Sequence, residues 1–82
     1  MDDGSWEVPI TFETHKLGKY WTVTSTAEAA RALMHKWPVD TGEAYGAALR
    51  TCLAAMEGDE TPDVARRAFL KAAEEADIFI RL

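Results

Sequence analysis

The chain has 82 residues, of which 48% are hydrophobic and 28% are charged, and its formal net charge at pH 7 is −5. This composition is typical of a globular protein, and the negative charge disfavours binding to nucleic acid or to an anionic membrane. One cysteine excludes an internal disulfide framework and a zinc site built from several cysteines, and no hydrophobic run approaches the roughly 20 residues that span a bilayer. We therefore expect a cytoplasmic protein with a single domain over residues 1–82, in which residues 1–5 are frayed.

The first predicted element is a strand over residues 6–14, where hydrophobic and polar residues alternate. Pro9 lies within it and has no N–H to donate to a neighbouring strand, which favours an edge position. Residues 20–24 are predicted to form a second strand, joined to the first by a polar connection that contains Gly18. Together these two strands form a hairpin.

A first helix is predicted to begin at Ser25 and to end before Pro38. Ser25 and Glu28 match a capping box, in which Glu28 reaches back to the N–H of Ser25 itself. The hydrophobic stripe of this helix consists of Ala29, Ala30, Leu33, Met34 and Trp37.

A second helix is predicted after Asp40, which we expect to be its cap, and Gly58 provides its stop. Its hydrophobic stripe consists of Ala44, Tyr45, Ala48, Leu49, Cys52, Leu53 and Met56. The other side has few charges and many small residues, a surface that we call the small-residue face: Gly46, Ala47, Thr51 and Ala54. Such a face suits contact with a second subunit, or burial under another element of the same chain.

A third helix is predicted to start with Thr61 as its cap and Pro62 at its first position. Its stripe is rich in alanine, with Phe69 as the one large residue. A strand over residues 78–82 follows after Asp77.

These elements predict a small α+β domain of the order β-β-α-α-α-β. The N-terminal hairpin and the C-terminal strand form a three-stranded sheet, and three helices cover one of its faces. Pro9 favours the second strand as the centre of the sheet, with the C-terminal strand on its free side. The direction of that last pairing stays open.

Four segments in this order resemble a known family: WEVPITF, TSTAEAARALMHKWP, AYGAALRTCLAAMEG and ARRAFLKAAEEADIFI. The most specific points are Trp37, Pro38, Cys52, Gly58 and the block 65–75. Over nearly its whole length the chain is similar to the domain of unknown function 982, found in short proteins of alpha-proteobacteria and of rhizobia especially. The resemblance implies a bacterial protein with a compact α+β fold, and it implies no activity, since the family has no assigned one to transfer.

Candidate reactive groups are few. Cys52 lies mid-helix on a hydrophobic stripe, far from the helix N-terminus, histidine or cation that would lower the pKa of its thiol, so we expect a buried core residue. His15 and His35 fall in a hairpin connection and on the polar side of a helix, whereas a zinc site needs three or four converging ligands. The sequence predicts no catalytic residue, no metal site and no cofactor.

Four aromatic residues form the remaining candidate site: Trp21, Trp37, Tyr45 and Phe69. One interpretation places them in the core, and the other makes them the lining of a pocket for a small ligand or a partner. The sequence leaves both interpretations open.

The leading functional hypothesis is a non-catalytic interaction module that self-associates or binds a protein partner. A homodimer would suit a chain whose own core is only just sufficient, and the small-residue face would supply the contact. The alternative is a small-molecule sensor that uses the aromatic residues. A cysteine-dependent enzyme is a distant third hypothesis.

Overall fold

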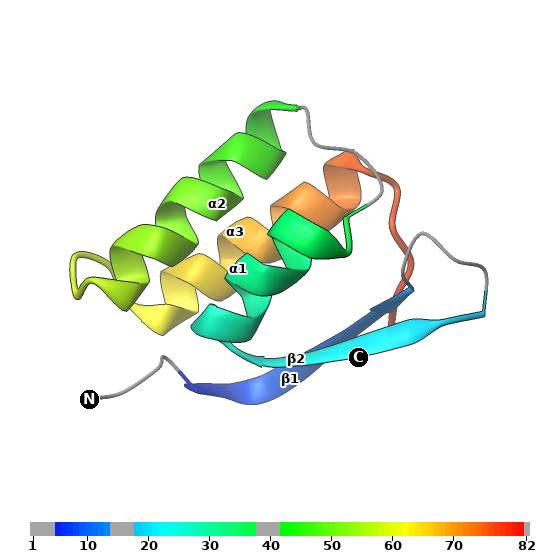
Figure 1. Cartoon of the computed structure of the whole chain (residues 1–82), viewed down its shortest axis with the longest axis horizontal. Coiled ribbons are helices and arrows are strands. Elements are labelled where there is room, and N and C mark those ends of the chain that lie inside the picture. Colours follow the sequence, from blue (N-terminus) through cyan, green and yellow to red (C-terminus); the bar gives the residue numbers. More distant parts are fainter. Residues whose placement is uncertain (1–4, 14–17, 38–41, 82) are drawn as a thin grey trace.

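The computed structural model describes residues 5–13, 18–37 and 42–81. In chain order the elements are β1 (Ser5–Glu13), β2 (Tyr20–Ser25), α1 (Thr26–His35), α2 (Glu43–Met56), α3 (Pro62–Glu75) and β3 (Ile80–Arg81). The three helices lie on one side of the three-stranded sheet (Figure 1). The predicted α+β fold and the predicted order of its elements are confirmed.

The sheet has the strand order β2-β1-β3, and both pairings are antiparallel. Ile10 of β1 pairs with Val23 of β2, and Thr11 pairs with Arg81 of β3. The central strand is therefore β1. The prediction that the second strand is central, with the C-terminal strand on its free side, is wrong.

Pro9 fits into the central strand because neither neighbour needs its missing N–H. On one side, the described residues of β3 pair with Thr11 and Phe12, and none of them lies opposite Pro9. On the other side, the register between β1 and β2 is irregular between Ser5 and Ile10. Proline is tolerated where a strand bulges or has no partner, and β1 provides both conditions.

The helices form two levels above the sheet. Helix α1 contacts β2 and α3 contacts β1, whereas α2 packs against α3 and α1 on the side away from the strands (Figure 1). Buried small residues, Ala48 and Cys52 of α2 and Ala65, Ala72 and Ala73 of α3, allow these helices to approach closely.

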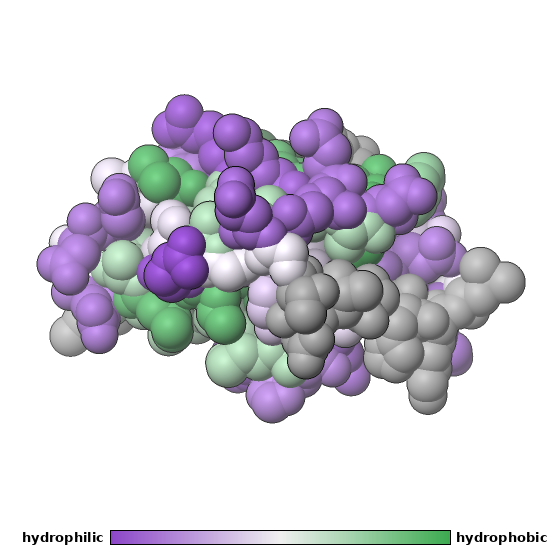
Figure 2. Space-filling model, turned by 90° about the horizontal axis from the view of Figure 1, so that it is seen from above, coloured by the Kyte–Doolittle hydropathy of each residue, from purple (hydrophilic) through white to green (hydrophobic). Residues whose placement is uncertain are grey.

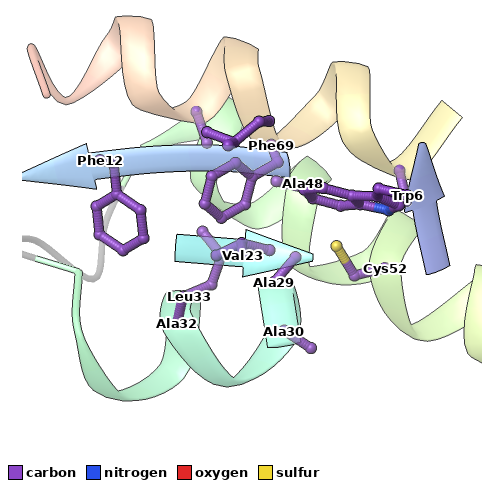
Figure 3. Packing of buried hydrophobic residues seen from close by; sticks show 13 residues of the cluster. Trp6, Phe12, Val23, Ala29, Ala30, Ala32, Leu33, Ala48, Cys52 and Phe69 are labelled. Carbon is purple, nitrogen blue, oxygen red and sulfur yellow. The ribbon is translucent and has the colours of Figure 1, made fainter. Parts of the chain in front are cut away.

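Aromatic rings meet around Phe69, which is fully buried. Its ring centroid lies 5.1 Å from that of Trp37, 5.7 Å from that of Phe12 and 5.8 Å from that of Trp6. Figure 3 shows the Phe69 ring between Phe12 and Trp6. Edge-to-face contacts of this kind add to the stability gained by burying the rings. Phe69 is the large residue at the centre of the α3 stripe, as the sequence predicts.

Three residues of the predicted helix stripes are instead largely exposed: Met34 (51%), Leu53 (44%) and Met56 (42%). Met34 and Met56 lie in the last turns of α1 and α2, where fewer neighbouring residues cover their side chains. Leu53 lies on the flank of the α2 stripe, beside the buried Cys52. Of the predicted strand over residues 78–82, residues 78 and 79 lie outside β3, and Leu82 is outside the described residues.

The start of α1 follows the predicted capping box in one half only. The Ser25 hydroxyl accepts a hydrogen bond from the Glu28 N–H at 3.2 Å, as expected. The Glu28 carboxylate, however, accepts from the backbone N–H of Thr24 at 2.6 Å and from its hydroxyl at 2.7 Å. The expectation that Glu28 bonds to the N–H of Ser25 is wrong by one residue.

The start of α2 departs from its prediction more strongly. The N-cap is Gly42, which has no side chain to accept a hydrogen bond, and Asp40 lies outside the described residues. The Glu75 carboxylate from the far end of α3 accepts instead, from the N–H of Ala44 at 3.0 Å and from the N–H of Tyr45 at 3.1 Å. A residue that is distant in sequence therefore satisfies two of the first backbone donors of α2.

Candidate binding groove between β1 and α3

A hollow of about 290 Å³ lies between the first half of β1 and the beginning of α3. We call it the edge groove, and its lining residues are Ser5, Trp6, Glu7, Val8, Thr61, Pro62, Asp63 and Arg66. Ligand pockets commonly have volumes of about 300–1,000 Å³. The edge groove is slightly smaller than that range, which suits a single side chain or a small polar group.

Both walls of the edge groove are fixed by hydrogen bonds. The Trp6 indole N–H donates to the Thr26 hydroxyl at 3.1 Å, and the indole is only 7% exposed. On the other wall, the Thr61 hydroxyl accepts from the Val64 N–H at 3.2 Å, and Pro62 occupies the first helical position. The predicted start of α3 is confirmed, and it places the first turn of the helix beside the strand.

Arg66 bridges the two walls. Its Nε donates a hydrogen bond to the Val8 carbonyl oxygen at 2.9 Å. The Val8 side chain remains 55% exposed, which is unusual for a valine in a central strand. The edge groove thus presents a hydrophobic side chain next to a carbonyl group that is already satisfied.

Carboxylates gather around this groove. Glu7 and Asp63 border it, and both are exposed. Asp63 forms a surface ion pair with Arg67 at 3.1 Å, while Glu7 has no hydrogen-bond or ion-pair partner in the described part of the chain. Further exposed carboxylates, those of Glu57, Asp59 and Glu60, precede the Thr61 cap. This end of the molecule is therefore rich in negative charge.

A second, more open hollow of about 530 Å³ lies beside the C-terminal half of α3 and the residues that follow it. Its lining residues are Leu70, Glu74, Asp77, Ile78, Phe79 and Ile80. Arg66, Leu70 and Glu74 are spaced four residues apart, so one face of α3 borders both hollows. Phe79 is 58% exposed beside this second hollow.

The structure brings together two of the four aromatic residues proposed for a pocket. Trp37 and Phe69 pack ring to ring in the core. Neither lines either of the two hollows described above. The indole N–H of Trp37 is buried and has no hydrogen-bond partner in the described part of the chain.

Trp21 and Tyr45, the other two, have partners of their own. The Lys36 ammonium lies 4.9 Å from the centroid of the Trp21 ring, a cation–π contact. The Tyr45 hydroxyl donates to the Leu33 carbonyl oxygen at 2.9 Å, which joins α2 to α1. Both side chains are half-buried, and the pocket formed by all four aromatic residues stays a prediction.

The small-residue face of α2 is half-buried at all four of its positions. Its polar side chain, Thr51, is satisfied within the helix, because its hydroxyl donates to the Ala47 carbonyl oxygen at 2.7 Å. Figure 2 looks down on the helical side of the molecule, where hydrophilic residues separate several small hydrophobic areas. Whether a second subunit contacts this face stays a prediction.

Cys52 is fully buried, and burial raises the pKa of its thiol to about 11. Its sulfur lies in the core near Trp6 and Ala29 (Figure 3). His35 is exposed at the end of α1, and His15 lies outside the described residues. Within the described ranges, no group of three His, Cys, Asp or Glu side chains is placed to hold a metal ion. No helix of the described part has the length and hydrophobicity to cross a bilayer.

Sequence reasoning missed the edge groove. It counted Val8 only among the hydrophobic residues that alternate along the first strand, and it gave Asp63 no role. The signal that was available is the spacing of Arg66, Leu70 and Glu74, which lie on one side of α3 outside its alanine stripe. No sequence signal placed Val8 next to Arg66, because their contact depends on the irregular register of β1.

Comparison with known proteins gives one match. A family model described as protein of unknown function (DUF982) matches residues 8–80, which include the three described helices and most of the sheet. No curated protein and no solved structure shows a significant match. The resemblance inferred from the four sequence segments is confirmed, and the chain belongs to the DUF982 family.

Proposed function

We propose that this protein is a non-catalytic interaction module that binds another polypeptide through the edge groove. The observation that carries the proposal is the exposed Val8 side chain in a preformed hollow between β1 and α3. A hydrophobic side chain exposed beside fixed walls provides area that a partner can bury without reordering the site. The same protein is proposed to act in the cytoplasm, because its cysteine is unpaired and buried, which suits a reducing compartment.

A non-catalytic role is supported by the state of Cys52, the side chain best suited to nucleophilic chemistry. The raised pKa of its thiol keeps the group protonated at neutral pH, and the sulfur is enclosed by the core. A thiol in that state is a poor nucleophile.

The test is a selection of random peptides displayed on phage against the folded, immobilised protein. Enriched peptides are then measured against Val8→Gln and against Leu53→Gln, a matched change of an exposed hydrophobic residue on α2. We expect Val8→Gln to weaken binding and Leu53→Gln to leave it unchanged. Absence of enriched peptides, or peptides that are indifferent to Val8→Gln, would contradict the proposal.

A further inference from the structure

The edge groove also indicates which chemical group it accepts. We propose that it binds a lysine or arginine side chain of the partner polypeptide, an inference that rests on the proposed function. The aliphatic part of that side chain would lie against Trp6, Val8 and Pro62, and its cationic group would reach the carboxylates of Glu7 and Asp63.

A side chain fits this groove better than an added β-strand. Strand addition requires free backbone donors and acceptors along an edge. Here Pro9 has no N–H, the Val8 carbonyl oxygen already accepts from Arg66, and the register is irregular between Ser5 and Ile10. Prolines and irregularities of this kind are the features by which strand edges avoid pairing with other chains. The groove therefore cannot accept an added β-strand, but it can accept a side chain.

A cation fits better than an anion for a related reason. The N-terminus of a helix attracts anions through its free N–H groups. At the start of α3, however, Pro62 has no N–H, and the Val64 N–H donates to the Thr61 hydroxyl. In the Arg66 guanidinium, Nε donates to the Val8 carbonyl oxygen at 2.9 Å, so this donor is not free for an anion. Glu7, in contrast, is an exposed carboxylate without a partner in the described part of the chain.

Long basic side chains match the mixed lining of this groove. Lysine and arginine combine a hydrophobic stem with a charged end, and they bury the stem while the charge stays near water. Trp6 and Val8 supply the hydrophobic wall, and the exposed carboxylates at the rim supply the complementary charge. Neither the hydrophobic wall by itself nor the carboxylates by themselves would select a lysine or arginine side chain.

The experiment uses a set of short glycine- and serine-flanked peptides that differ only at a central lysine, arginine, norleucine or glutamate. Each is titrated into the full-length ¹⁵N-labelled protein, and backbone amide shifts give both the affinity and the location of binding. The variants are Glu7→Gln and Asp63→Asn, with Glu43→Gln as the control, since Glu43 is likewise an exposed carboxylate in the first turn of a helix.

We expect the lysine and arginine peptides to bind more tightly than the norleucine peptide and to shift the amides of Glu7, Val8 and Arg66. Glu7→Gln and Asp63→Asn should each weaken this binding about two- to fivefold, as for exposed ion pairs, and added salt should weaken it further. Glu43→Gln should have no effect.

Several outcomes would overturn this inference. If the norleucine peptide bound as tightly as the lysine and arginine peptides and shifted the same amides, the groove would recognise only hydrophobic side chains. That result would leave the proposed function intact. Tighter binding of the glutamate peptide would show an anion site. Shifts confined to other parts of the protein would show that the groove binds no peptide. Shifts that depend only on protein concentration would show that the groove binds a second copy of this chain.

Discussion

The Glu75 carboxylate lies against Gly42, although Gly42 comes directly before α2 and Glu75 is the last residue of α3. The Glu75 carboxylate accepts hydrogen bonds from the first N–H groups of α2, and it stands where a Cβ at position 42 would lie. Gly42 has a φ of 118°, a conformation that side chains disfavour. The absence of a side chain at Gly42 is therefore what lets the end of α3 cap the beginning of α2.

Gly42→Ala is expected to destabilise the protein more than Gly58→Ala. Both glycines have positive φ, but nothing lies within 4 Å of the position that a Cβ would take at Gly58. Gly58→Ala should therefore cost about 1–2 kcal/mol from backbone strain alone. Gly42→Ala should cost about 0.5–2 kcal/mol more, because it also displaces the Glu75 cap. Urea unfolding measures both values.

A second pair of variants in a Glu75→Ala background tests the cause of that difference. Without the carboxylate, the two glycine substitutions should cost similar free energies of unfolding. If Gly42→Ala remained the more damaging change, the collision with Glu75 would not be its cause.

The Glu75 cap is also an example of a contact that local sequence patterns do not predict. The starts of α1 and α3 were predictable because Ser25 and Thr61 cap the N–H groups three residues ahead. The cap of α2 comes from 31 positions away for Ala44, and no local pattern encodes that contact. Pro9 misled the sheet prediction for a related reason, since the irregular register beside it is a property of the folded chain.

The candidate site was likewise predictable from the sequence only in part. Burial of Phe69 and Cys52 was predictable from helical periodicity. The edge groove was not, because it depends on where the irregular part of β1 passes the first turn of α3. Periodicity identifies the side of a helix that is buried, but it does not locate a hollow between two elements that are far apart in sequence.

Phe69→Ala should lower the free energy of unfolding by about 3–5 kcal/mol, because it removes the ring that three other aromatic rings contact. Phe79→Ala is the matched control, since Phe79 is 58% exposed. Its cost should stay near 0.5 kcal/mol, as is usual for surface substitutions (roughly ±0.5 kcal/mol). Thermal unfolding followed by circular dichroism compares the two, and equal melting temperatures would contradict the described core.

Cys52 should resist thiol reagents in the folded protein and react only after unfolding. Burial raises its pKa from 9.0 to about 11, so the folded state favours the protonated thiol. The stability that this provides is complete below pH 9.0 and is lost as the pH rises towards 11. Labelling at pH 8 with and without denaturant is the measurement. Rapid stoichiometric labelling of the native protein would refute the buried position.

Glu28 should make stability depend on pH on the acidic side. Hydrogen bonds from the Thr24 hydroxyl and the Thr24 N–H, with a smaller contribution from the Arg31 charge, hold the pKa of its carboxyl below the ordinary 4.5. A lowered pKa stabilises the folded state above 4.5, and this contribution is lost as the pH falls through the folded-state value. Parent and Glu28→Gln should therefore differ in urea midpoint at neutral pH and converge in acid.

The control for that comparison is Glu7→Gln, because the Glu7 carboxylate has no hydrogen-bond partner in the described ranges. Its urea midpoint should stay parallel to that of the parent across the same pH range. A Glu28→Gln curve that also stayed parallel would mean that the Thr24 contacts do not stabilise the fold.

Self-association through the small-residue face remains a proposal, and Ala47→Glu with Ala54→Lys tests it. Both positions are half-buried on α2, so charged side chains there would disrupt a close contact between subunits. We expect the parent to form dimers in sedimentation equilibrium and the double variant to run as a folded monomer. A parent that stays monomeric at high concentration, or a double variant that unfolds, would reject this interface.

The antiparallel pairing of β1 with β3 has a consequence for synthesis of the chain. Phe12 lies opposite Ile80, so the central strand receives its second neighbour from a segment that is made after all three helices. Phe69, around which the aromatic rings pack, also belongs to the final third of the chain. A ribosome that adds about 5–20 residues per second therefore exposes β1 and its hydrophobic side chains for some seconds before the sheet closes. During that interval the hairpin and α1 depend on local contacts alone.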